Sequence, residues 1–192
     1  KQAEVVQSVR ENKISVVPAG NMLGKDYALG FVATTAILCP QVYFSQDYVE
    51  HVESLRSERN TNPHTVRVIT TSVKDDHLRV LWGEINGFIQ RSRYPLEFYR
   101  GGPLVINHRD IRKVVRKQLC PTSYLRGMVA ADPAGMAGHH AKYTFLLIDE
   151  ASGVGDYVLT QGETWAMRIV EIGNTNPYNN FFKRQIEAGD VL

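Results

Sequence analysis

The sequence has few cysteines, almost no net charge and no long apolar run. Cys39 and Cys120 are too few for a disulfide framework and lack metal-site spacing, which suits a reducing cytoplasm. The net charge of +2, from 22 basic and 20 acidic residues, does not demand a nucleic-acid partner, so any such contact must come from a local patch. Because no apolar run reaches the roughly 18 residues that span a bilayer, we expect no membrane segment.

The composition is that of one globular domain. Apolar residues make up 43% and charged residues 22% of 192 residues, which allows a substantial core and excludes a disordered chain. The sequence shows no internal repeat and no low-complexity tract. We therefore expect a single domain over residues 1–192.

Short apolar runs alternate with helical patterns, which is typical of a parallel sheet covered by helices. Strands are predicted at residues 14–17, 66–70, 143–148 and 168–172. The third of these has almost no polar interruption, so we expect it to be central and buried on both faces.

Helices are predicted at residues 25–38 and 180–188, and the segment 91–102 reads as a loop. A third helix should follow Ser72, which has the spacing of a capping box with Asp75. Its buried face would carry Leu78, Leu81, Trp82, Ile85, Phe88 and Ile89. A surface helix is indicated by the apolar spacing of Tyr48, Val49, Val52 and Leu55.

Residues 17–26, VPAGNMLGKD, follow a predicted strand and open a predicted helix. Against the phosphate-loop pattern G-x-x-x-x-G-K-[ST], they are one residue short between the glycines, and Asp26 stands where a hydroxyl is expected. Glycines let backbone N–H groups converge on phosphate, and Lys25 can reach the terminal phosphates. The alternative is a plain strand-to-helix turn. The predicted nucleotide contacts are Ala19, Gly20, Asn21, Met22, Leu23, Gly24, Lys25, Asp26 and Tyr27.

Two carboxylates follow the apolar run 145–148. At the carboxyl end of a strand, Asp149 would orient Mg²⁺ and Glu150 would polarise the water that attacks the γ-phosphate. The alternative is a solvated charged turn, but the loop and the acidic pair occur together, each after a strand. Asp26 is a further Mg²⁺ candidate, although its charge lies beside phosphates.

Other polar positions carry weaker predictions. Gly173, Asn174 and Thr175 end the next strand and could sense the γ-phosphate, or form an ordinary turn. Arg126 could donate charge to that phosphate or serve the structure. His139 and its neighbour His140 lack further ligands at zinc-like spacing, so we expect them to shape a loop.

Five basic side chains would lie on one face if residues 109–118 were helical. Such a stripe could bind the DNA backbone without sequence preference. Two alternatives are an ordinary solvated helix face and a β-hairpin, which would scatter the charges. The residues are Arg109, Arg112, Lys113, Arg116 and Lys117.

Taken together, these motifs resemble the ATPase domain of phage terminase large subunits. The resemblance rests on Lys25 in its short loop, on FLLIDEASG at 145–153 and on the Gly173 turn, with further similar stretches at 70–78 and 135–140. It covers nearly the whole chain, with residues 40–64 as a variable piece.

The resemblance implies an α/β, three-layer P-loop NTPase (RecA/ASCE-like) with a mostly parallel central sheet. It implies a motor that uses ATP and Mg²⁺ to move double-stranded DNA into a capsid in the host cytoplasm. Its partners would be DNA, the portal and capsid, the small terminase subunit and further copies in a ring. Gln2 would read adenine, Lys25 would bind phosphate, Asp149 would organise Mg²⁺, Glu150 would catalyse hydrolysis and Asn174 would couple it to motion.

Two departures from the family pattern matter. The loop lacks the arginine that terminases often carry, so charge compensation must come from elsewhere, for example a neighbouring subunit. The family's C-terminal nuclease domain is absent from this sequence, so we expect no DNA cleavage by this chain. The alternative functions are a helicase-type ATPase acting on DNA or RNA and a non-hydrolysing nucleotide-binding module.

Overall fold

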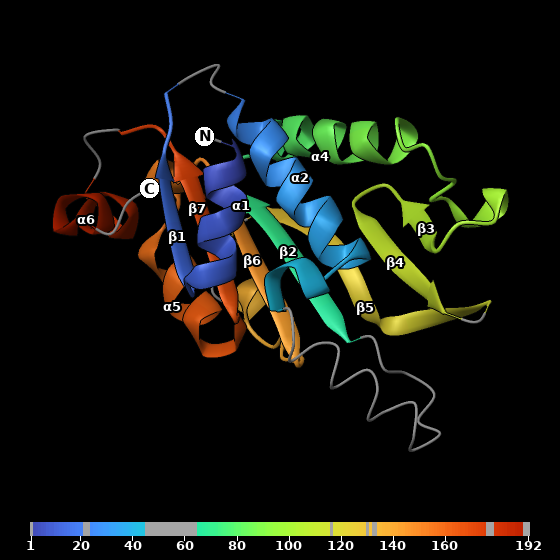
Figure 1. The fold of residues 1–192 in the computed structure, drawn as a ribbon. Coiled ribbons are helices and arrows are strands. Elements are labelled where there is room, and N and C mark those ends of the chain that lie inside the picture. The colour runs from blue at the N-terminus through green and yellow to red at the C-terminus, as the bar shows by residue number, and fades with distance from the viewer. Residues whose placement is uncertain are drawn as a thin grey trace.

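A seven-stranded mixed sheet forms the centre of the molecule, in the order β1-β7-β6-β2-β5-β4-β3 (Figure 1). The computed structural model describes residues 2–20, 24–44, 65–115, 117–129, 131, 134–175 and 179–189, with only the backbone of Gln2. The strands are β1 (Ile14–Pro18), β2 (Val66–Ser72), β3 (Leu104–Asn107), β4 (Asp110–Val115), β5 (Gln118–Val129), β6 (Tyr143–Asp149) and β7 (Arg168–Gly173).

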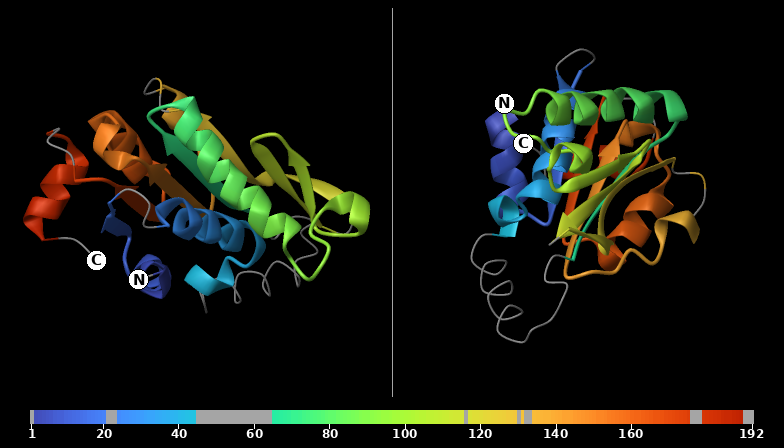
Figure 2. Two further views of the ribbon diagram at one scale, coloured as in Figure 1. Left: turned by 90° about the horizontal axis from the view of Figure 1, so that it is seen from above. Right: turned by 90° about the vertical axis from the view of Figure 1, so that its right-hand side faces the viewer.

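Helices cover both faces of this sheet, giving three layers. Figure 2 shows α1 and α5 on opposite sides of the strands. The helices are α1 (Gln2–Glu11), α2 (Lys25–Leu38), α4 (Asp75–Gln90), α5 (Asp156–Trp165) and α6 (Phe181–Ala188), with short 3-10 turns η1 (Phe98–Arg100), η2 (Ala134–Met136) and η3 (Ala151–Gly153). Side chains of α1, α2 and α4 share one apolar core with the sheet, while α5 and α6 share a second core on the other face.

The parallel part of the sheet confirms the strands predicted from sequence. β1, β7, β6, β2 and β5 pair in parallel, and every residue of β6 is buried, as a central strand requires. The last strand of the chain, β7, lies between β1 and β6. The phosphate-loop strand and the acidic strand are therefore separated by one strand rather than adjacent.

The two helices that follow β1 and β2 form where the pattern predicted them. α2 spans the predicted residues 25–38, and Gly24 begins it in a left-handed conformation (φ 71°) that favours glycine. In α4 the predicted apolar face is buried except for Phe88, which is half-buried. The capping-box prediction is wrong, because Ser72 is still extended and paired with Val129 of β5. Lys74 occupies the N-cap position of α4 instead.

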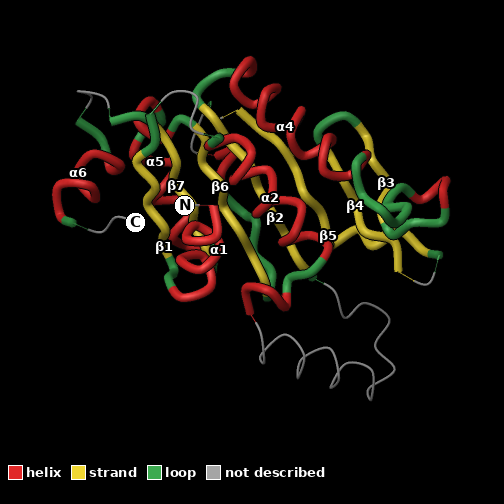
Figure 3. Tube along the Cα trace, turned by 45° about the horizontal axis from the view of Figure 1, so that its top comes forward, coloured by secondary structure: helices red, strands yellow, loops and turns green. Residues whose placement is uncertain are grey.

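Residues 109–118 are not a helix, and of the alternatives left open the β-hairpin is the one that forms. They run through β4 into β5, and β4 pairs antiparallel with both β3 and β5. β-branched Ile111, Val114 and Val115 favour extended backbone, and β3 supplies the partner strand. Figure 3 shows this hairpin of β3 and β4 extending the sheet at the end far from β1.

The remaining predictions are met in part. Asn180 caps α6 by accepting a hydrogen bond from the Lys183 N–H, so the helix begins one residue later than predicted. Residues 91–102 are irregular apart from η1. The surface helix predicted around residues 48–55 lies outside the described residues. Among the described residues, no helix is long and apolar enough to cross a membrane.

Candidate functional site

Three predicted motifs meet at the carboxyl edge of the sheet. Pro18 at the end of β1 lies beside Gly173 at the end of β7, and Ile172 lies beside Asp149 of β6. The N–H of Ala19, the first residue of the phosphate loop, donates to the Gly173 carbonyl at 2.9 Å. The loop, the acidic pair and the Gly173 turn therefore form one site.

Lys25 connects the loop to the acidic pair. As the first residue of α2 it is only 9% exposed, and its ammonium donates to Glu150 Oε1. The same Nζ lies 3.7 Å from Asp149 Oδ1. A helix N-terminus and a buried ammonium thus converge on one point, which is an arrangement that favours a polyanionic ligand.

Asp149 is the more deeply buried member of the pair. Burial raises the pKa of its carboxyl to about 7, and the charge of Lys25 only partly offsets this rise. Its Oδ1 atom is fully buried and accepts no hydrogen bond. Such an oxygen fits a hard divalent cation such as Mg²⁺, which prefers oxygen ligands.

Asp26 adds a third carboxylate next to the first two. Burial raises the pKa of Asp26, Lys25 lowers it and Glu150 raises it further, so the three acidic groups share one electrostatic environment. Within the described residues, no group of three or more His, Cys, Asp or Glu side chains has the geometry of a closed metal cage.

The turn after Asp149 has an uncommon backbone. Glu150 is left-handed (φ 50°, ψ 45°) and leads into η3. Gly173 approaches this turn so closely that a β-carbon there would lie 2.9 Å from the Ala151 nitrogen and 3.2 Å from that of Ser152. The absence of a side chain at Gly173 therefore keeps the Glu150 turn in place.

An apolar pocket of about 360 Å³ lies beside the start of α2. It is lined by Ala3 and Val6 of α1 and by Tyr27, Ala28 and Phe31 of α2. Tyr27, a predicted nucleotide contact, is 41% exposed. The size and apolar walls of this pocket suit a flat heterocycle. Gln2 is the first residue of α1, the helix that forms one wall of the pocket.

The basic residues predicted to bind DNA do not form a stripe. Arg109 pairs with Asp75, Arg112 pairs with Asp110, and burial lowers the pKa of Lys113. Lys117 is exposed, and Arg116 lies outside the described residues. The strands scatter the charges, as the β-hairpin alternative predicted.

Arg126 and His139 both serve the structure. Arg126 donates to Asp110 at 2.9 Å and stacks over Tyr124, with its guanidinium carbon 4.8 Å from the ring centroid. Tyr124 also contacts His139 Nδ1 at 3.1 Å. Asn174 is half-buried and Thr175 is exposed just beyond Gly173, while Asn21, Met22 and Leu23 lie outside the described residues.

Sequence reasoning missed one polar neighbour of the acidic pair. His77, in the first turn of α4, places Nδ1 3.9 Å from Glu150 Oε1. The available signal was its position: it stands just after a central strand that ends at the same edge of the sheet as Asp149.

The order of the strands and the helices on both faces define an α/β P-loop NTPase fold, and solved structures of phage large terminases have a similar fold. The HK97 bacteriophage large terminase matches with a TM-score of 0.61 at 9% identity, over 98% of this chain and 36% of that chain. The large-terminase ATPase domain of Thermus phage P74-26, as a mutant, matches with a TM-score of 0.58 at 16% identity, over 94% and 67%.

These matches show the fold, and the chain spans only 36% of the HK97 protein. No protein-family model and no curated protein matches the sequence. The predicted fold class is confirmed.

Proposed function

We propose that this chain is the ATPase motor domain of a terminase large subunit, which hydrolyses ATP to move double-stranded DNA into a capsid in the host cytoplasm. The observation that carries the proposal is the convergence of Lys25, Asp149 and Glu150 at the carboxyl edge of a sheet with the large-terminase fold. The nuclease activity of the family is not assigned to these residues.

Each residue of the site has a distinct task. Lys25 and the N–H groups at the start of α2 bind the β- and γ-phosphates, and phosphate oxygens compete with Glu150 for the ammonium. Glu150, once released, accepts a proton from the water that attacks the γ-phosphate in line. The pocket around Tyr27 takes the adenine base, and Gln2, the residue that begins α1, reads it.

Asp149 would hold Mg²⁺, with Asp26 as a further ligand through water. The burial of these carboxyls and the Oδ1 of Asp149, which accepts no hydrogen bond, fit the ion. Bound Mg²⁺ would neutralise charge on the phosphate oxygens. Because Asp26 replaces the usual hydroxyl, we expect weaker nucleotide affinity than in a loop with Ser or Thr.

Product release would be transmitted through Gly173. Its carbonyl holds the loop residue Ala19, and its α-carbon abuts the Glu150 turn. Asn174 and Thr175, which follow it, would carry the change to the DNA-gripping surface, in a ring with the portal, capsid and small subunit as partners. Arg112 of β4 and Lys117, in the turn between β4 and β5, remain proposed DNA contacts.

Steady-state ATP hydrolysis with and without double-stranded DNA tests this function. We expect hydrolysis that DNA stimulates, and losses of about 10² to 10⁴ in kcat for Glu150→Gln, which removes the proton acceptor. Lys25→Ala should abolish nucleotide binding as well as turnover. Glu187→Gln, at an exposed position on α6, is the matched control and should behave as the parent.

The outcomes separate the alternatives. Stimulation by single-stranded DNA or RNA but not by duplex DNA would favour a helicase-type ATPase. Nucleotide binding without turnover, unchanged by Glu150→Gln, would favour a non-hydrolysing module and contradict the proposal.

A further inference from the structure

The first turn of α4 faces the acidic pair and is tied on its other side to the β3–β4 hairpin. We propose that His77 is a positioning residue for Glu150, and that the Arg109–Asp75 ion pair holds His77 in place. This inference rests on the proposed function, because it assigns Glu150 the proton-accepting role. These contacts would connect Glu150 to the β3–β4 hairpin at the far end of the sheet.

The position of His77 follows from the strand before it. β2 pairs with β6 through Thr71 and Ile148, so the two strands reach the same edge of the sheet together. α4 begins at Asp75, three residues after β2 ends, and its first turn therefore stands beside the Glu150 turn. His77 Nδ1 lies 3.9 Å from Glu150 Oε1, the same oxygen that Lys25 contacts.

Lys25 of α2 and His77 of α4 thus both approach the same carboxylate oxygen of Glu150. When phosphate oxygens take up the Lys25 ammonium, His77 is the remaining side chain within ion-pair distance of Glu150 Oε1 among the described residues. The imidazole can then orient the carboxylate toward the attacking water. Because His77 is 43% exposed, a rotation of the ring into solvent would release Glu150 unless the helix turn is held firmly.

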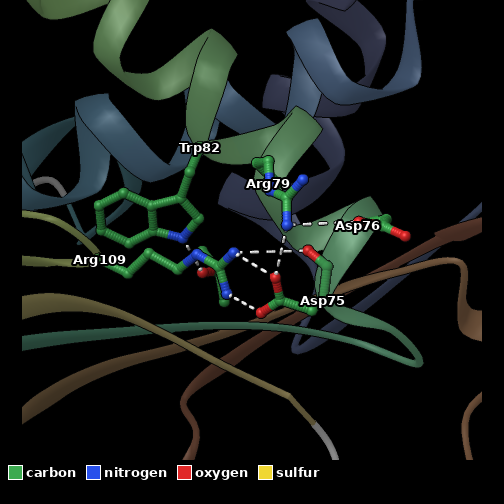
Figure 4. Close-up of polar contacts among 6 residues, drawn as sticks. Asp75, Asp76, Arg79, Trp82 and Arg109 are labelled. Atoms are coloured by element: carbon green, nitrogen blue, oxygen red, sulfur yellow. Dashed lines mark hydrogen bonds and ion pairs between the residues drawn. The ribbon is translucent and has the colours of Figure 1, made fainter.

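Arg109 supplies that hold. It lies in the turn just before β4, and its guanidinium donates to both carboxylate oxygens of Asp75, with Nη2 3.0 Å from Oδ2 (Figure 4). Arg109 is only 14% exposed, and its carbonyl accepts the Gly127 N–H of β5 at 2.9 Å. The Arg109 side chain draws the pKa of Asp75 down to about 2. A bidentate pair on a fixed backbone locates the helix start more firmly than a single contact does.

Arg79 offers a matched control, because it contacts the same carboxylate without anchoring it to the sheet. Its Nη2 lies 3.3 Å from Asp75 Oδ2 and 3.4 Å from Asp76 Oδ1, all within α4, and the side chain is 70% exposed. Loss of Arg79 removes a positive charge beside Asp75 but leaves the ion pair that links α4 to the hairpin intact.

Steady-state kinetics of the variants test the proposal. We expect His77→Ala to lower kcat about tenfold with KM for ATP changed less than about twofold, and His77→Gln to recover part of the loss. Arg109→Ala should lower kcat about three- to tenfold, again without a matching rise in KM. Arg79→Ala should match the parent in both constants. Equal effects of Arg109→Ala and Arg79→Ala, or an unchanged kcat in His77→Ala, would overturn the inference.

A spectroscopic readout keeps the inference separate from the proposed function. The ring resonances of His77, assigned from the His77→Gln spectrum, should shift in Glu150→Gln and in Arg109→Ala but not in Arg79→Ala. If the parent chain hydrolyses no ATP, the proposed function fails while this experiment still decides whether His77 and Glu150 are in contact. His77 ring resonances that do not shift in Glu150→Gln would overturn the positioning role.

Discussion

Glu150 adopts a left-handed backbone conformation that costs a non-glycine residue about 1–3 kcal/mol. The conformation survives because the surroundings fix it: Gly173 leaves room for the turn, and Lys25 binds the carboxylate from α2. It also turns the Glu150 carboxylate toward Lys25 and His77. Strain of this kind gathers where geometry serves function, here at the carboxylate to which we assign hydrolysis.

Glu171 of β7 predicts a pH dependence of stability. Burial raises the pKa of this carboxyl from its ordinary 4.5 to about 8, so the folded protein holds a proton that the unfolded chain has lost. Between these values Glu171 should lower the free energy of unfolding by about 1.4 kcal/mol per pH unit as pH rises. Buried Asp149, whose pKa is raised to about 7, adds a slope of the same sign over its own range. Glu171→Gln is neutral at every pH, and it should flatten this slope and stabilise the protein near the upper end of the window.

Urea denaturation at several pH values across that window measures the slope. Glu187→Gln on α6, where the side chain is 63% exposed, is the control and should leave the slope of the parent unchanged. A Glu171→Gln variant that retains the parent slope would show that another group controls the pH dependence.

Lys25, Asp149 and Glu150 could be predicted because their chemistry stands directly after apolar runs, where strands of a parallel sheet deliver side chains to one edge. His77 and Glu171 could not. Glu171 is the one acidic residue in the short strand β7, and its complete burial depends on the packing of the sheet. The contact of His77 with Glu150 depends on the pairing of β2 with β6, which the local sequence does not specify.

The hairpin shows where helical periodicity misleads. Residues 109–118 place basic and apolar side chains at helical spacing, yet β4 forms because β3 and β5 flank it and their side chains complete the core. Ile111 and Leu104 are fully buried in the core that α4 covers. Pairing with β3 and β5 therefore outweighed the helical spacing of residues 109–118, as is common for short segments rich in β-branched residues.

The Trp82 side chain of α4 packs directly on Gly127 of β5, which has no side chain. A β-carbon at Gly127 would lie 2.3 Å from Trp82 Nε1, which donates to Thr70 Oγ1 at 2.9 Å. Gly127→Ala should therefore lower the free energy of unfolding by about 1–3 kcal/mol, because α4 must move away from the sheet. Chemical denaturation of purified variants gives this quantity.

Gly83, one residue after Trp82 on α4, is the matched control. Nothing lies within 4 Å of a β-carbon built there, and the residue is exposed in the middle of a helix. Gly83→Ala should raise the free energy of unfolding by about 0.5–1 kcal/mol. If both substitutions had the same sign, close packing at Gly127 would not be the cause of its effect.

The order of strands in the whole sheet could be predicted only in part. Alternating strands and helices indicated a parallel α/β sheet, but the position of β7 between β1 and β6 is a long-range feature that no local pattern records. That position lets Gly173 touch both the loop and the Glu150 turn. Identities of 9% and 16% to two large terminases show that a similar fold forms from a very different sequence.

The nucleotide retained by the protein after incubation with Mg-ATP, with protein in excess, tests the central claim most directly. A single turnover suffices, so the measurement does not require a ring or DNA. We expect the parent to retain ADP, Glu150→Gln to retain ATP and Lys25→Ala to retain neither. Intact ATP on the parent, or no nucleotide on any of the three proteins, would contradict the assignment of this edge of the sheet as an ATPase site.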